Sequence, residues 1–457
     1  MKITFIGGGP GGYEAAIYAA KKGAEVVVIE KDKLGGTCLN RGCIPTKAFL
    51  ASSEVLETVK NAAEFGINVG EPTADYTAIL ERKNKVVDQL VRGIGYLFEA
   101  NGITHIEGFG KLIDEHTIEV AKADGTTETV TSDYIILATG SKALCPAMFN
   151  VDRKRVITSD EILSLPEAPK SLILVGGGVI GCEIGQFLNA MGTEVTIVEA
   201  LPRVMATMDE DVSKAIAKQF RKEKIKVITG DGIAEVTPAE DSVSVKLASG
   251  KELTADYCLV AIGRAAYTDG LGVENTSVVK DERGRIVVDE YLKTAADNIY
   301  AIGDIILSPQ LAHVASKEGF VAVDNIFGEN KKMDYRAVPG CVFTTPQLAS
   351  VGTLETQLQR EEKEYKTGTF EFRALGKAQA SGHINGFVKV ITDMDDTVIG
   401  AEIVGHDASD MLQVLTLAVQ LGLKAEQLEE CIYPHPTMCE AIKEAVHDIK
   451  GMAINKA

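Results

Sequence analysis

Two cysteines in a glycine-rich segment have the residue types and the spacing for redox chemistry. Cys38 and Cys43 lie in the stretch Gly-Gly-Thr-Cys-Leu-Asn-Arg-Gly-Cys-Ile-Pro-Thr-Lys, residues 35–47. Pro45 is typical of the first turn of a helix, because the N–H that proline lacks has no partner there. We therefore expect Cys43 at a helix N-terminus, where the helix dipole stabilises a thiolate and lowers its pKa.

Three interpretations of the cysteine pair compete. A structural disulfide would close a loop of only six residues, which stabilises a fold by about 2 kcal/mol, and the cytosol would reduce it. A metal site normally needs a second ligand pair, and none follows in the sequence at zinc-finger spacing. A catalytic dithiol explains both cysteines, the helix N-terminus and the glycines together, and we favour it.

The elements that would position these cysteines contain an internal repeat. Residues 3–30 and residues 172–199 each read as strand, Gly-x-Gly-x-x-Gly, helix and second strand, and 23 positions separate the first glycine from a terminal glutamate in both. The pattern is typical of Rossmann dinucleotide-binding units, in which the glycines let the backbone approach a pyrophosphate and the acid binds a ribose hydroxyl. The residues concerned are Gly7, Gly9, Gly12 and Glu30 in the first copy, and Gly176, Gly178, Gly181 and Glu199 in the second.

Two nucleotide sites in one chain predict that a hydride or an electron pair passes between two cofactors. Glu199 favours NAD over NADP as the second nucleotide, since a 2'-phosphate would face its carboxylate and only Arg203 lies nearby in the sequence to offset it.

The strands that close the units predict the domain organisation. Residues 134–140 and 257–263 close the two units, and a third such strand, residues 299–303, indicates that later sequence completes one of them. After about residue 338, alternating segments at 386–393 and 398–404 and helical periodicity over 411–423 predict an α+β domain. The fold class is therefore α/β, with two Rossmann-like domains and an α+β C-terminal domain. The expected domains are residues 1–142, 143–268, 269–337 (which completes the first) and 338–457.

Composition excludes several classes of partner. The chain has 457 residues and a net charge of -18, which argues against nucleic acid or an anionic membrane surface as the main partner. The longest apolar stretch, residues 172–191, contains Glu183 and Gln186 and is not expected to span a membrane. The N-terminus leads straight into a glycine loop, so we expect no signal peptide and a cytosolic location.

Residues 35–47 resemble the redox-disulfide motif of the FAD-dependent pyridine nucleotide-disulfide oxidoreductases. The choices Cys-Leu-Asn and Cys-Ile-Pro are most similar to the branch of that family that oxidises dihydrolipoamide, since glutathione-type and mercuric reductases usually carry Val at Leu39 and Ile44. The resemblance covers essentially the whole chain, including both glycine loops and the segments 138–140, 301–304 and 435–440.

The resemblance implies a role for each matching residue. The first unit would bind FAD, with Asp304 on the ribityl chain, and the second would bind NAD. Lys47 would pair with Glu183 near the flavin, and the redox cysteines would be Cys38, which forms the mixed disulfide, and Cys43, which faces the flavin. The other residues expected at the cofactors are Thr37, Thr139, Gly140, Gly263 and Ala312.

His435 is the acid/base that the resemblance implies, because thiol-disulfide exchange needs a proton acceptor. From the residues alone, a histidine held in a Pro-His-Pro turn is the favoured interpretation. Glu440 would orient His435, although Thr437-x-x-Glu440 also matches a capping box that opens the last helix. In the family this pair serves the other subunit's disulfide, which implies a homodimer with a shared active site.

The activity implied is oxidation of protein-bound dihydrolipoamide to lipoamide, with reduction of NAD+ through the Cys38–Cys43 disulfide and FAD. The partner would be a lipoyl-bearing protein of a 2-oxoacid dehydrogenase or glycine cleavage system. The alternatives are another flavin disulfide reductase of glutathione type, or a slow redox or docking subunit of a multienzyme complex. The segment Ala265-Ala266-Tyr267 departs from the family at the expected nicotinamide end.

The remaining cysteines are expected to carry no chemistry. Cys439 replaces a usual serine beside His435 and is expected to be a small buried residue, with a secondary thiol role as the alternative. The other five occupy apolar sequence contexts and are predicted to fill cores: Cys145, Cys182, Cys258, Cys341 and Cys431.

Overall fold

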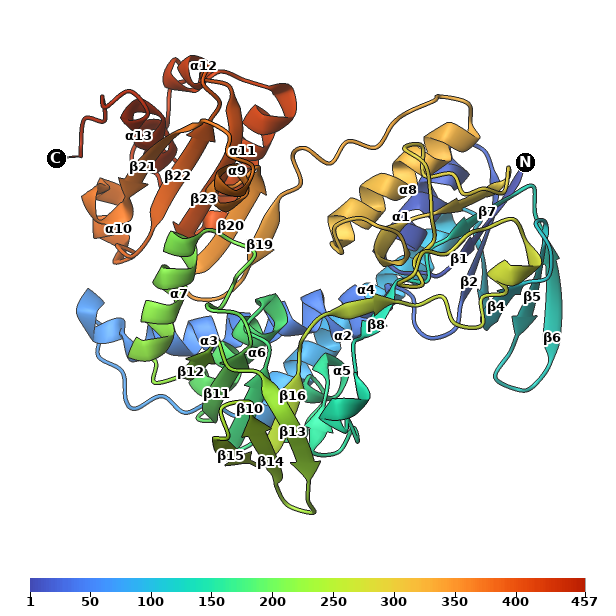
Figure 1. Cartoon of the computed structure of the whole chain (residues 1–457), viewed down its shortest axis with the longest axis horizontal. Helices are drawn as coiled ribbons and strands as arrows, with labels where there is room; N and C mark the ends of the chain where they lie inside the picture. The colour runs from blue at the N-terminus through green and yellow to red at the C-terminus, as the bar shows by residue number, and fades with distance from the viewer. Residues whose placement is uncertain (457) are drawn as a thin grey trace.

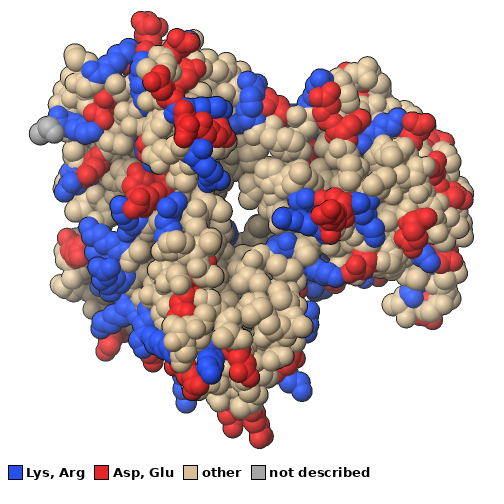
Figure 2. Space-filling view, viewed as in Figure 1, with Lys and Arg blue, Asp and Glu red and all other residues tan. Residues whose placement is uncertain are grey.

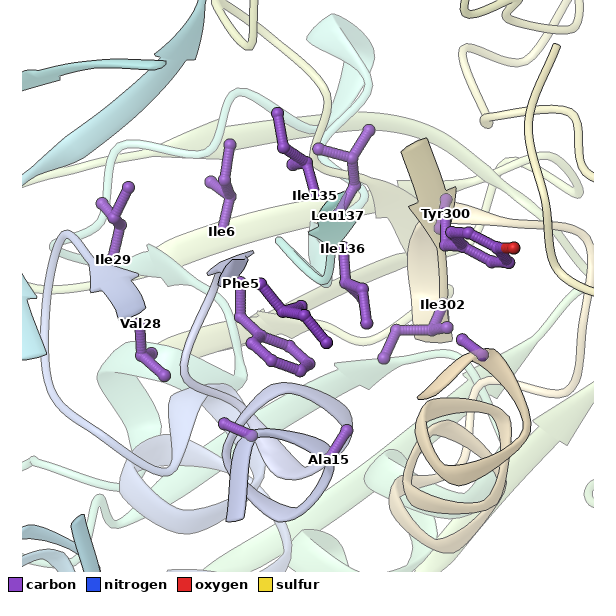
Figure 3. Close-up of a cluster of buried hydrophobic side chains, with 14 of the residues drawn as sticks. Phe5, Ile6, Ala15, Val28, Ile29, Ile135, Ile136, Leu137, Tyr300 and Ile302 are labelled. Atoms are coloured by element: carbon purple, nitrogen blue, oxygen red, sulfur yellow. The ribbon is translucent and has the colours of Figure 1, made fainter. Parts of the chain in front are cut away.

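The first nucleotide unit is built on a five-stranded parallel sheet in the computed structural model, which describes residues 1–456. The strand order is β18 (Ile299–Ala301), β7 (Tyr134–Leu137), β1 (Lys2–Ile6), β2 (Glu25–Glu30) and β3 (Thr104–Glu107). Parallel strands are buried on both faces and therefore read as continuous apolar runs. In Figure 3, Phe5 and Ile136 point toward the helix that carries Ala15, and Ile6 and Ile135 point to the opposite face.

Two helices cover one face of this sheet. Helix α1 (Pro10–Lys21) and helix α8 (Ala312–Ile326) pack against each other, although about 300 residues of chain separate them. Because β18 pairs with β7 and α8 packs on α1, the chain returns to the first unit after passing through the second. An antiparallel sheet of β4 (Phe109–Leu112), β5 (Thr117–Ala121) and β6 (Thr127–Thr131) lies at its edge. The domain limits given above remain a prediction.

The second unit repeats the parallel architecture. Its strand order is β12 (Lys226–Thr229), β11 (Glu194–Glu199), β10 (Ser171–Val175), β16 (Tyr257–Val260) and β9 (Val156–Ile157). The associated elements are α5 (Ser159–Ile162), α6 (Val179–Ala190), α7 (Glu210–Lys222), β13 (Ile233–Pro238), β14 (Val243–Leu247) and β15 (Glu252–Ala255). The antiparallel pair β8 (Ser141–Ala143) and β17 (Arg264–Ala266) connects the two units.

The C-terminal domain is a third lobe, at the upper left of Figure 1. Its antiparallel sheet runs β19 (Gly340–Val342), β20 (Gln347–Gly352), β23 (Val398–Gly405), β22 (Phe387–Thr392) and β21 (Lys366–Glu371). The alternating segments predicted at 386–393 and 398–404 are β22 and β23, and the periodic segment at 411–423 is α11 (Ala408–Leu421). Shorter helices complete it: α9 (Glu355–Arg360), α10 (Gly376–Ser381), α12 (Ala425–Glu429) and α13 (Glu440–Asp448).

The redox segment lies on two helices that follow β2. Helix α2 (Gly36–Arg41) carries Cys38, and α3 (Cys43–Lys60) begins at Cys43. Helix α3 packs against the long helix α4 (Tyr76–Ala100) of the first unit and against α6 of the second. The helix that begins at Cys43 therefore lies between the two nucleotide units.

Charge is unevenly distributed although the chain is strongly acidic. Figure 2 shows acidic and basic side chains interspersed over most of one face, with basic side chains gathered along α7 and the start of β12. The exposed residues of this stripe are Lys214, Lys218, Arg221, Lys222 and Lys226. Within residues 1–456, no helix combines the length and apolarity needed to cross a membrane.

The prediction that five cysteines fill cores is wrong for two of them. Cys182 and Cys258 are fully buried, and the half-buried Cys341 packs against the core of the C-terminal domain, but Cys145 and Cys431 are exposed. Cys145 and Cys431 have apolar neighbours in the sequence, but both lie outside helices and strands, where apolar neighbours do not imply burial.

Candidate redox and nucleotide-binding site

Cys43 has the properties of the thiolate of the cysteine pair. The Cys38 thiol hydrogen-bonds to Cys43, and this bond, with the positive charge of Lys47, lowers the pKa of Cys43 to about 7. The same bond, with burial, raises the pKa of Cys38. The helix N-terminus predicted a low pKa for Cys43, but the larger cause is the neighbouring thiol, which the sequence spacing alone does not reveal.

Lys47 and Glu183 form an ion pair between the two units. The Lys47 Nζ lies 2.7 Å from Oε2 and 2.9 Å from Oε1 of Glu183, whose side chain is 3% exposed. Lys47 is one helical turn after Cys43 on α3, and Glu183 is on α6. The Phe343 N–H, from the C-terminal domain, donates to Glu183 Oε1 at 2.8 Å. All three lobes therefore meet at Glu183.

Both glycine loops have the backbone geometry that their spacing predicts. Gly7 has a φ of +113°, and a Cβ there would lie 2.2 Å from the Ala138 carbonyl oxygen. Gly176 has a φ of +107°, and a Cβ there would lie 2.4 Å from the Ala261 carbonyl oxygen. Side chains are therefore excluded at matching positions, as the tight turn from strand to helix in a dinucleotide-binding loop requires.

The two strand-end glutamates are held in the same way. Glu30 Oε2 accepts from the Gly8 N–H at 2.7 Å, and Glu199 Oε2 accepts from the Gly177 N–H at 2.7 Å. The second oxygen of each accepts a further backbone N–H just beyond the strand. A carboxylate oxygen has two lone pairs, so each glutamate keeps acceptor capacity for a ribose hydroxyl.

A cavity beside Glu30 fits the adenosine half of FAD. Its lining includes the Gly7 loop, Glu30, Thr139 and Tyr267. The Lys31 Nζ lies 3.5 Å from the centroid of the Tyr267 ring, and the Thr139 hydroxyl donates to the Tyr267 carbonyl at 2.6 Å. Tyr267, in the segment expected at the nicotinamide end, therefore contacts the first unit instead.

The other residues expected along FAD lie on elements that converge on the first glycine loop. A Cβ on Gly36 would lie 2.7 Å from the Cα of Gly9, so the start of α2, with Thr37, packs on that loop. Asp304 accepts a hydrogen bond from the Ser141 hydroxyl, and Ala312 is the first residue of α8. This arrangement fits one extended dinucleotide that reaches from the loop to the cysteines. Gly140 follows β7, the closing strand of the first unit. For the second nucleotide, Gly178 and Gly181 open α6, and Gly263 follows the closing strand β16.

Glu440 contacts His435 and also holds the turn that leads into the last helix, α13. The His435 Nδ1 lies 2.9 Å from Glu440 Oε1, and the Thr437 N–H donates to Glu440 Oε2 at 2.9 Å. Burial opposes the charge of Glu440, but these hydrogen bonds lower its pKa on balance. The expected capping box is only half formed: the Thr437 hydroxyl donates to the Pro434 carbonyl and accepts no N–H from α13.

His435 lies on an open surface of the C-terminal domain. Its side chain is 77% exposed, and within residues 1–456 neither redox cysteine is among its hydrogen-bond partners. The half-buried Cys439 has its pKa raised by burial, so it lacks the low pKa of a second reactive thiolate.

These features define a class: an oxidoreductase with two dinucleotide units and a redox dithiol on the helix between them. The sequence pattern described as "Pyridine nucleotide-disulphide oxidoreductase" matches residues 1–319, and that of its dimerisation domain matches residues 338–446. The chain therefore belongs to the pyridine nucleotide-disulphide oxidoreductase family. Enzymes of this family use FAD and NAD, which agrees with the two glycine loops.

Named relatives cover nearly the full length of the chain. Dihydrolipoyl dehydrogenase of Cupriavidus necator is 38% identical, over 99% of this chain and 98% of its own length. Dihydrolipoyl dehydrogenase of Bacillus subtilis is 39% identical with the same coverage. Among solved structures, LpdA from Mycobacterium tuberculosis matches with a TM-score of 0.92 and 28% identity, covering 98% of this chain and 99% of that one. The flavoprotein disulfide reductase RclA from Escherichia coli matches with a TM-score of 0.87 at 28% identity, with coverage of 98% and 99%.

One residue at the site escaped the sequence analysis, and another was expected elsewhere. Phe343 donates its N–H to Glu183, and its ring centroid lies 4.6 Å from the Lys47 Nζ. Tyr267 forms part of the wall of the cavity beside Glu30. Tyr267 belongs to the segment that departs from the family's usual residues, and that departure was the available signal.

Proposed function

We propose that this enzyme is a dihydrolipoyl dehydrogenase, which oxidises protein-bound dihydrolipoamide to lipoamide and reduces NAD+. The observation that carries the proposal is the cysteine pair on α2 and α3. Cys43, with a pKa of about 7, is next to Cys38 and one helical turn from the Lys47–Glu183 pair. A dithiol placed between two nucleotide units suits the transfer of an electron pair from a thiol substrate to a nicotinamide.

The thiol chemistry follows from the different pKa values of the two cysteines. One thiolate of dihydrolipoamide attacks the Cys38 sulfur, forms a mixed disulfide and releases Cys43 as a thiolate, which suits a leaving group of low pKa. The second substrate thiol then attacks the substrate sulfur bound to Cys38, which closes lipoamide and releases the Cys38 thiol. The substrate loses two electrons and two protons, and the protein disulfide gains the two electrons.

The protons need an acceptor, and His435 is the residue we assign to that role. Its Nδ1 contacts Glu440, which leaves Nε2 free to accept a proton from a substrate thiol. Because His435 is exposed on the C-terminal domain, we propose that the partner subunit's His435 serves each cysteine pair in a homodimer.

The nucleotide units account for the second half of the reaction. FAD, when bound, supplies the redox carrier between the dithiol and NAD. The Gly7 loop and Glu30 would bind FAD, and the Gly176 loop and Glu199 would bind NAD. Lys47 places a positive charge beside Cys43, which stabilises the thiolate while the cysteines are reduced.

The proposed partner is a lipoyl-bearing protein of a 2-oxoacid dehydrogenase or glycine cleavage system, in the cytosol. One experiment separates this function from its alternatives: steady-state oxidation of dihydrolipoamide by the holoenzyme with NAD+ or NADP+. We expect rapid turnover with NAD+ and little with NADP+. Turnover of glutathione disulfide with NADPH instead would indicate a reductase of glutathione type, and negligible turnover of both would indicate a redox or docking subunit.

A further inference from the structure

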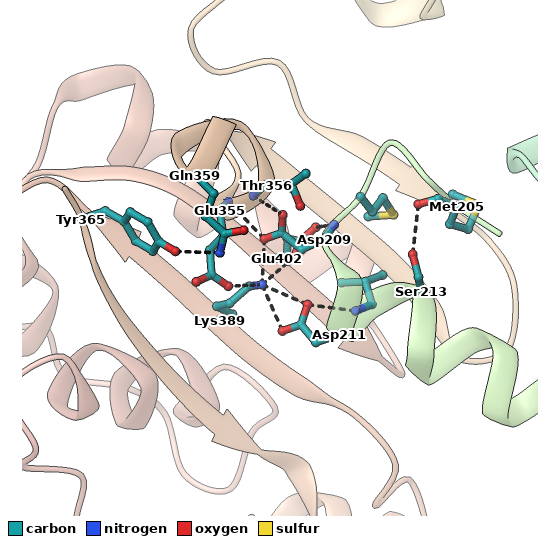
Figure 4. A network of polar contacts seen from close by, with 12 residues as sticks. Met205, Asp209, Asp211, Ser213, Glu355, Thr356, Gln359, Tyr365, Lys389 and Glu402 are labelled. Carbon is teal, nitrogen blue, oxygen red and sulfur yellow. Dashed lines mark hydrogen bonds and ion pairs between the residues drawn. The ribbon is translucent and has the colours of Figure 1, made fainter. Parts of the chain in front are cut away.

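A buried lysine connects the second unit to the C-terminal domain. Lys389 on β22 is 1% exposed, and its Nζ lies 2.8 Å from Asp209, 3.0 Å from Asp211, 2.8 Å from Glu355 and 3.0 Å from Glu402 (Figure 4). The two aspartates belong to the start of α7 in the second unit. The two glutamates belong to α9 and β23 in the C-terminal domain. One ammonium group therefore binds carboxylates from both lobes.

Asp209 strengthens this connection through the backbone. Its carboxylate accepts hydrogen bonds from the Glu355 N–H at 3.2 Å and the Thr356 N–H at 2.9 Å. Its own N–H donates to Glu402 Oε1 at 3.1 Å. The first N–H groups of a helix lack partners within the helix, so a residue of the second unit caps α9 of the C-terminal domain.

The cluster depends on the charge of Lys389. Four carboxylates surround one ammonium group, and removing one partner of a buried ion pair leaves an uncompensated charge, which is strongly destabilising. Asp209, Asp211 and Glu402 lie close enough together to hold a metal ion, but the Lys389 Nζ already lies among them. Without that ammonium group, the carboxylates of Asp209 and Asp211 would repel that of Glu355 on α9.

A second contact between the same two lobes lies at the redox site. The side chain of Gln186 on α6 accepts from the Thr345 N–H at 2.7 Å and donates to the Thr345 carbonyl at 2.8 Å. Glu183, one turn earlier on α6, accepts from the Phe343 N–H. Phe343 and Thr345 lie between β19 and β20, in the sheet that also contains β22 and β23. The Lys389 cluster and Glu183 are therefore two attachment points of the second unit on one sheet.

We propose that Lys389 is a positioning residue for the redox site. By holding α7 against β22, β23 and α9, it keeps α6 in the position in which Glu183 accepts the Phe343 N–H and pairs with Lys47. Loss of the Lys389 charge would loosen this attachment and weaken the influence of Glu183 on Lys47 and Cys43. The proposal extends the proposed function, but it can be tested on the protein without substrate or NAD.

The first test is amide hydrogen exchange in the FAD-containing dimer. In Lys389→Met, which keeps the length of the side chain and removes the charge, we expect exchange over residues 341–346 to accelerate about tenfold or more. Lys389→Arg, which keeps the charge, should restore part of the protection. Lys366→Met is the matched control, because Lys366 pairs with Asp396 within the C-terminal domain and does not contact the second unit. We expect this control to exchange like the wild type.

The second test measures whether loss of the Lys389 charge changes the pKa of Cys43. The charge of Glu183 raises the pKa of Cys43, so Lys389→Met should lower the midpoint of Cys43 alkylation against pH in the reduced protein. Glu183→Gln should shift the midpoint in the same direction. The double variant should shift it no further than Glu183→Gln alone, because both changes act through one residue.

The proposal is wrong if Lys389→Met accelerates exchange only near residues 355 and 356 and leaves residues 341–346 and the alkylation midpoint unchanged. The cluster would then only cap α9. If Lys389→Met does not fold, Lys389→Gln is measured in the same way. The exchange over residues 341–346 and the alkylation midpoint of Cys43 then test the proposal. Neither measurement needs dihydrolipoamide or NAD, so a failure of the proposed function would leave both results unaffected.

Discussion

The carboxylate of Glu183 pairs with the ammonium group of Lys47 at 2.7 Å, and so joins the helix that begins at Cys43 to the helix that follows the second glycine loop. The charge of Glu183 raises the pKa of Cys43. Glu183 therefore opposes part of the stabilisation that Lys47 gives to the Cys43 thiolate. Glu183 therefore influences how much of Cys43 is a thiolate near neutral pH.

Replacing Glu183 should lower the pKa of Cys43. In reduced Glu183→Gln, we expect the midpoint of Cys43 alkylation with iodoacetamide to fall below about 7 by about half a unit to one unit. Lys47→Met should move the midpoint upward, because the positive charge is lost. Identical alkylation profiles in both variants and the wild type would show that the ion pair does not act on Cys43.

Cys43 should be the thiolate that contacts the flavin. We expect Cys43→Ser to retain yellow FAD, to show no long-wavelength thiolate-flavin absorption band on reduction, and to lose turnover by about a thousandfold or more. Cys38→Ser should lose turnover equally but keep a thiolate at Cys43 and hence the band. Absorption spectra of the two variants with free thiols and oxidised FAD make the comparison, and a band in Cys43→Ser would exclude Cys43 as the donor.

The exposure of His435 predicts that active sites are shared between subunits. Homodimers of His435→Gln and of Cys43→Ser should each be nearly inactive. A purified heterodimer of the two should regain about half of the wild-type activity, because one of its two sites combines an intact cysteine pair with an intact His435. Heterodimers as inactive as either parent would rule out a site that uses both subunits.

Glu199 should decide the choice of nicotinamide nucleotide. Its carboxylate is held by the Gly177 and Leu201 N–H groups at the end of β11. We expect Glu199→Ala to raise the KM for NAD+ by about tenfold to a hundredfold, since one to two ribose hydrogen bonds are lost, and to reduce discrimination against NADP+. Glu194→Ala, at the exposed start of the same strand, is the control. Initial rates with both nucleotides test this, and an unchanged preference would contradict it.

The Lys389 cluster should make stability depend on pH. Burial, opposed by Lys389, raises the pKa of Glu402 to about 8, so the folded protein holds a proton that the unfolded chain releases near its ordinary value of about 4.5. This stabilising contribution is complete below pH 4.5 and is lost as the pH rises through 8. In that window it falls by roughly 1.4 kcal/mol per pH unit at most.

Glu402→Gln tests this pH dependence, because its amide stays neutral and can still accept the Asp209 N–H. Urea unfolding midpoints at several pH values between 5 and 9 should fall more steeply for the wild type than for the variant. Parallel curves for the two proteins would show that Glu402 does not titrate in this range.

The parts of the site that depend on local spacing could be predicted from the sequence. The positions of Gly7 and Gly176, the glutamates 23 residues later and the helix that begins at Cys43 all follow from neighbours in the chain. The strands β22 and β23 follow from alternation of apolar and polar residues in the same way.

The remaining features depend on contacts between distant segments. The Phe343 N–H reaches Glu183 across 160 residues, and the Lys389 Nζ reaches Asp209 across 180. No local pattern encodes such pairs. The exposure of Cys145 and Cys431 was mispredicted for a related reason, because apolar neighbours in the sequence do not determine what packs against a loop.

The central claim is that the Cys38–Cys43 dithiol carries electrons from dihydrolipoamide to NAD+. The most direct test traps both cysteines with iodoacetamide under anaerobic conditions and measures their alkylation by mass spectrometry. We expect neither cysteine to be alkylated in the oxidised holoenzyme, and both after one equivalent of dihydrolipoamide. Addition of NAD+ should make both cysteines resistant to alkylation again, and addition of NADP+ should not. Formation of NADH while Cys38 and Cys43 stay unalkylated throughout would contradict the account.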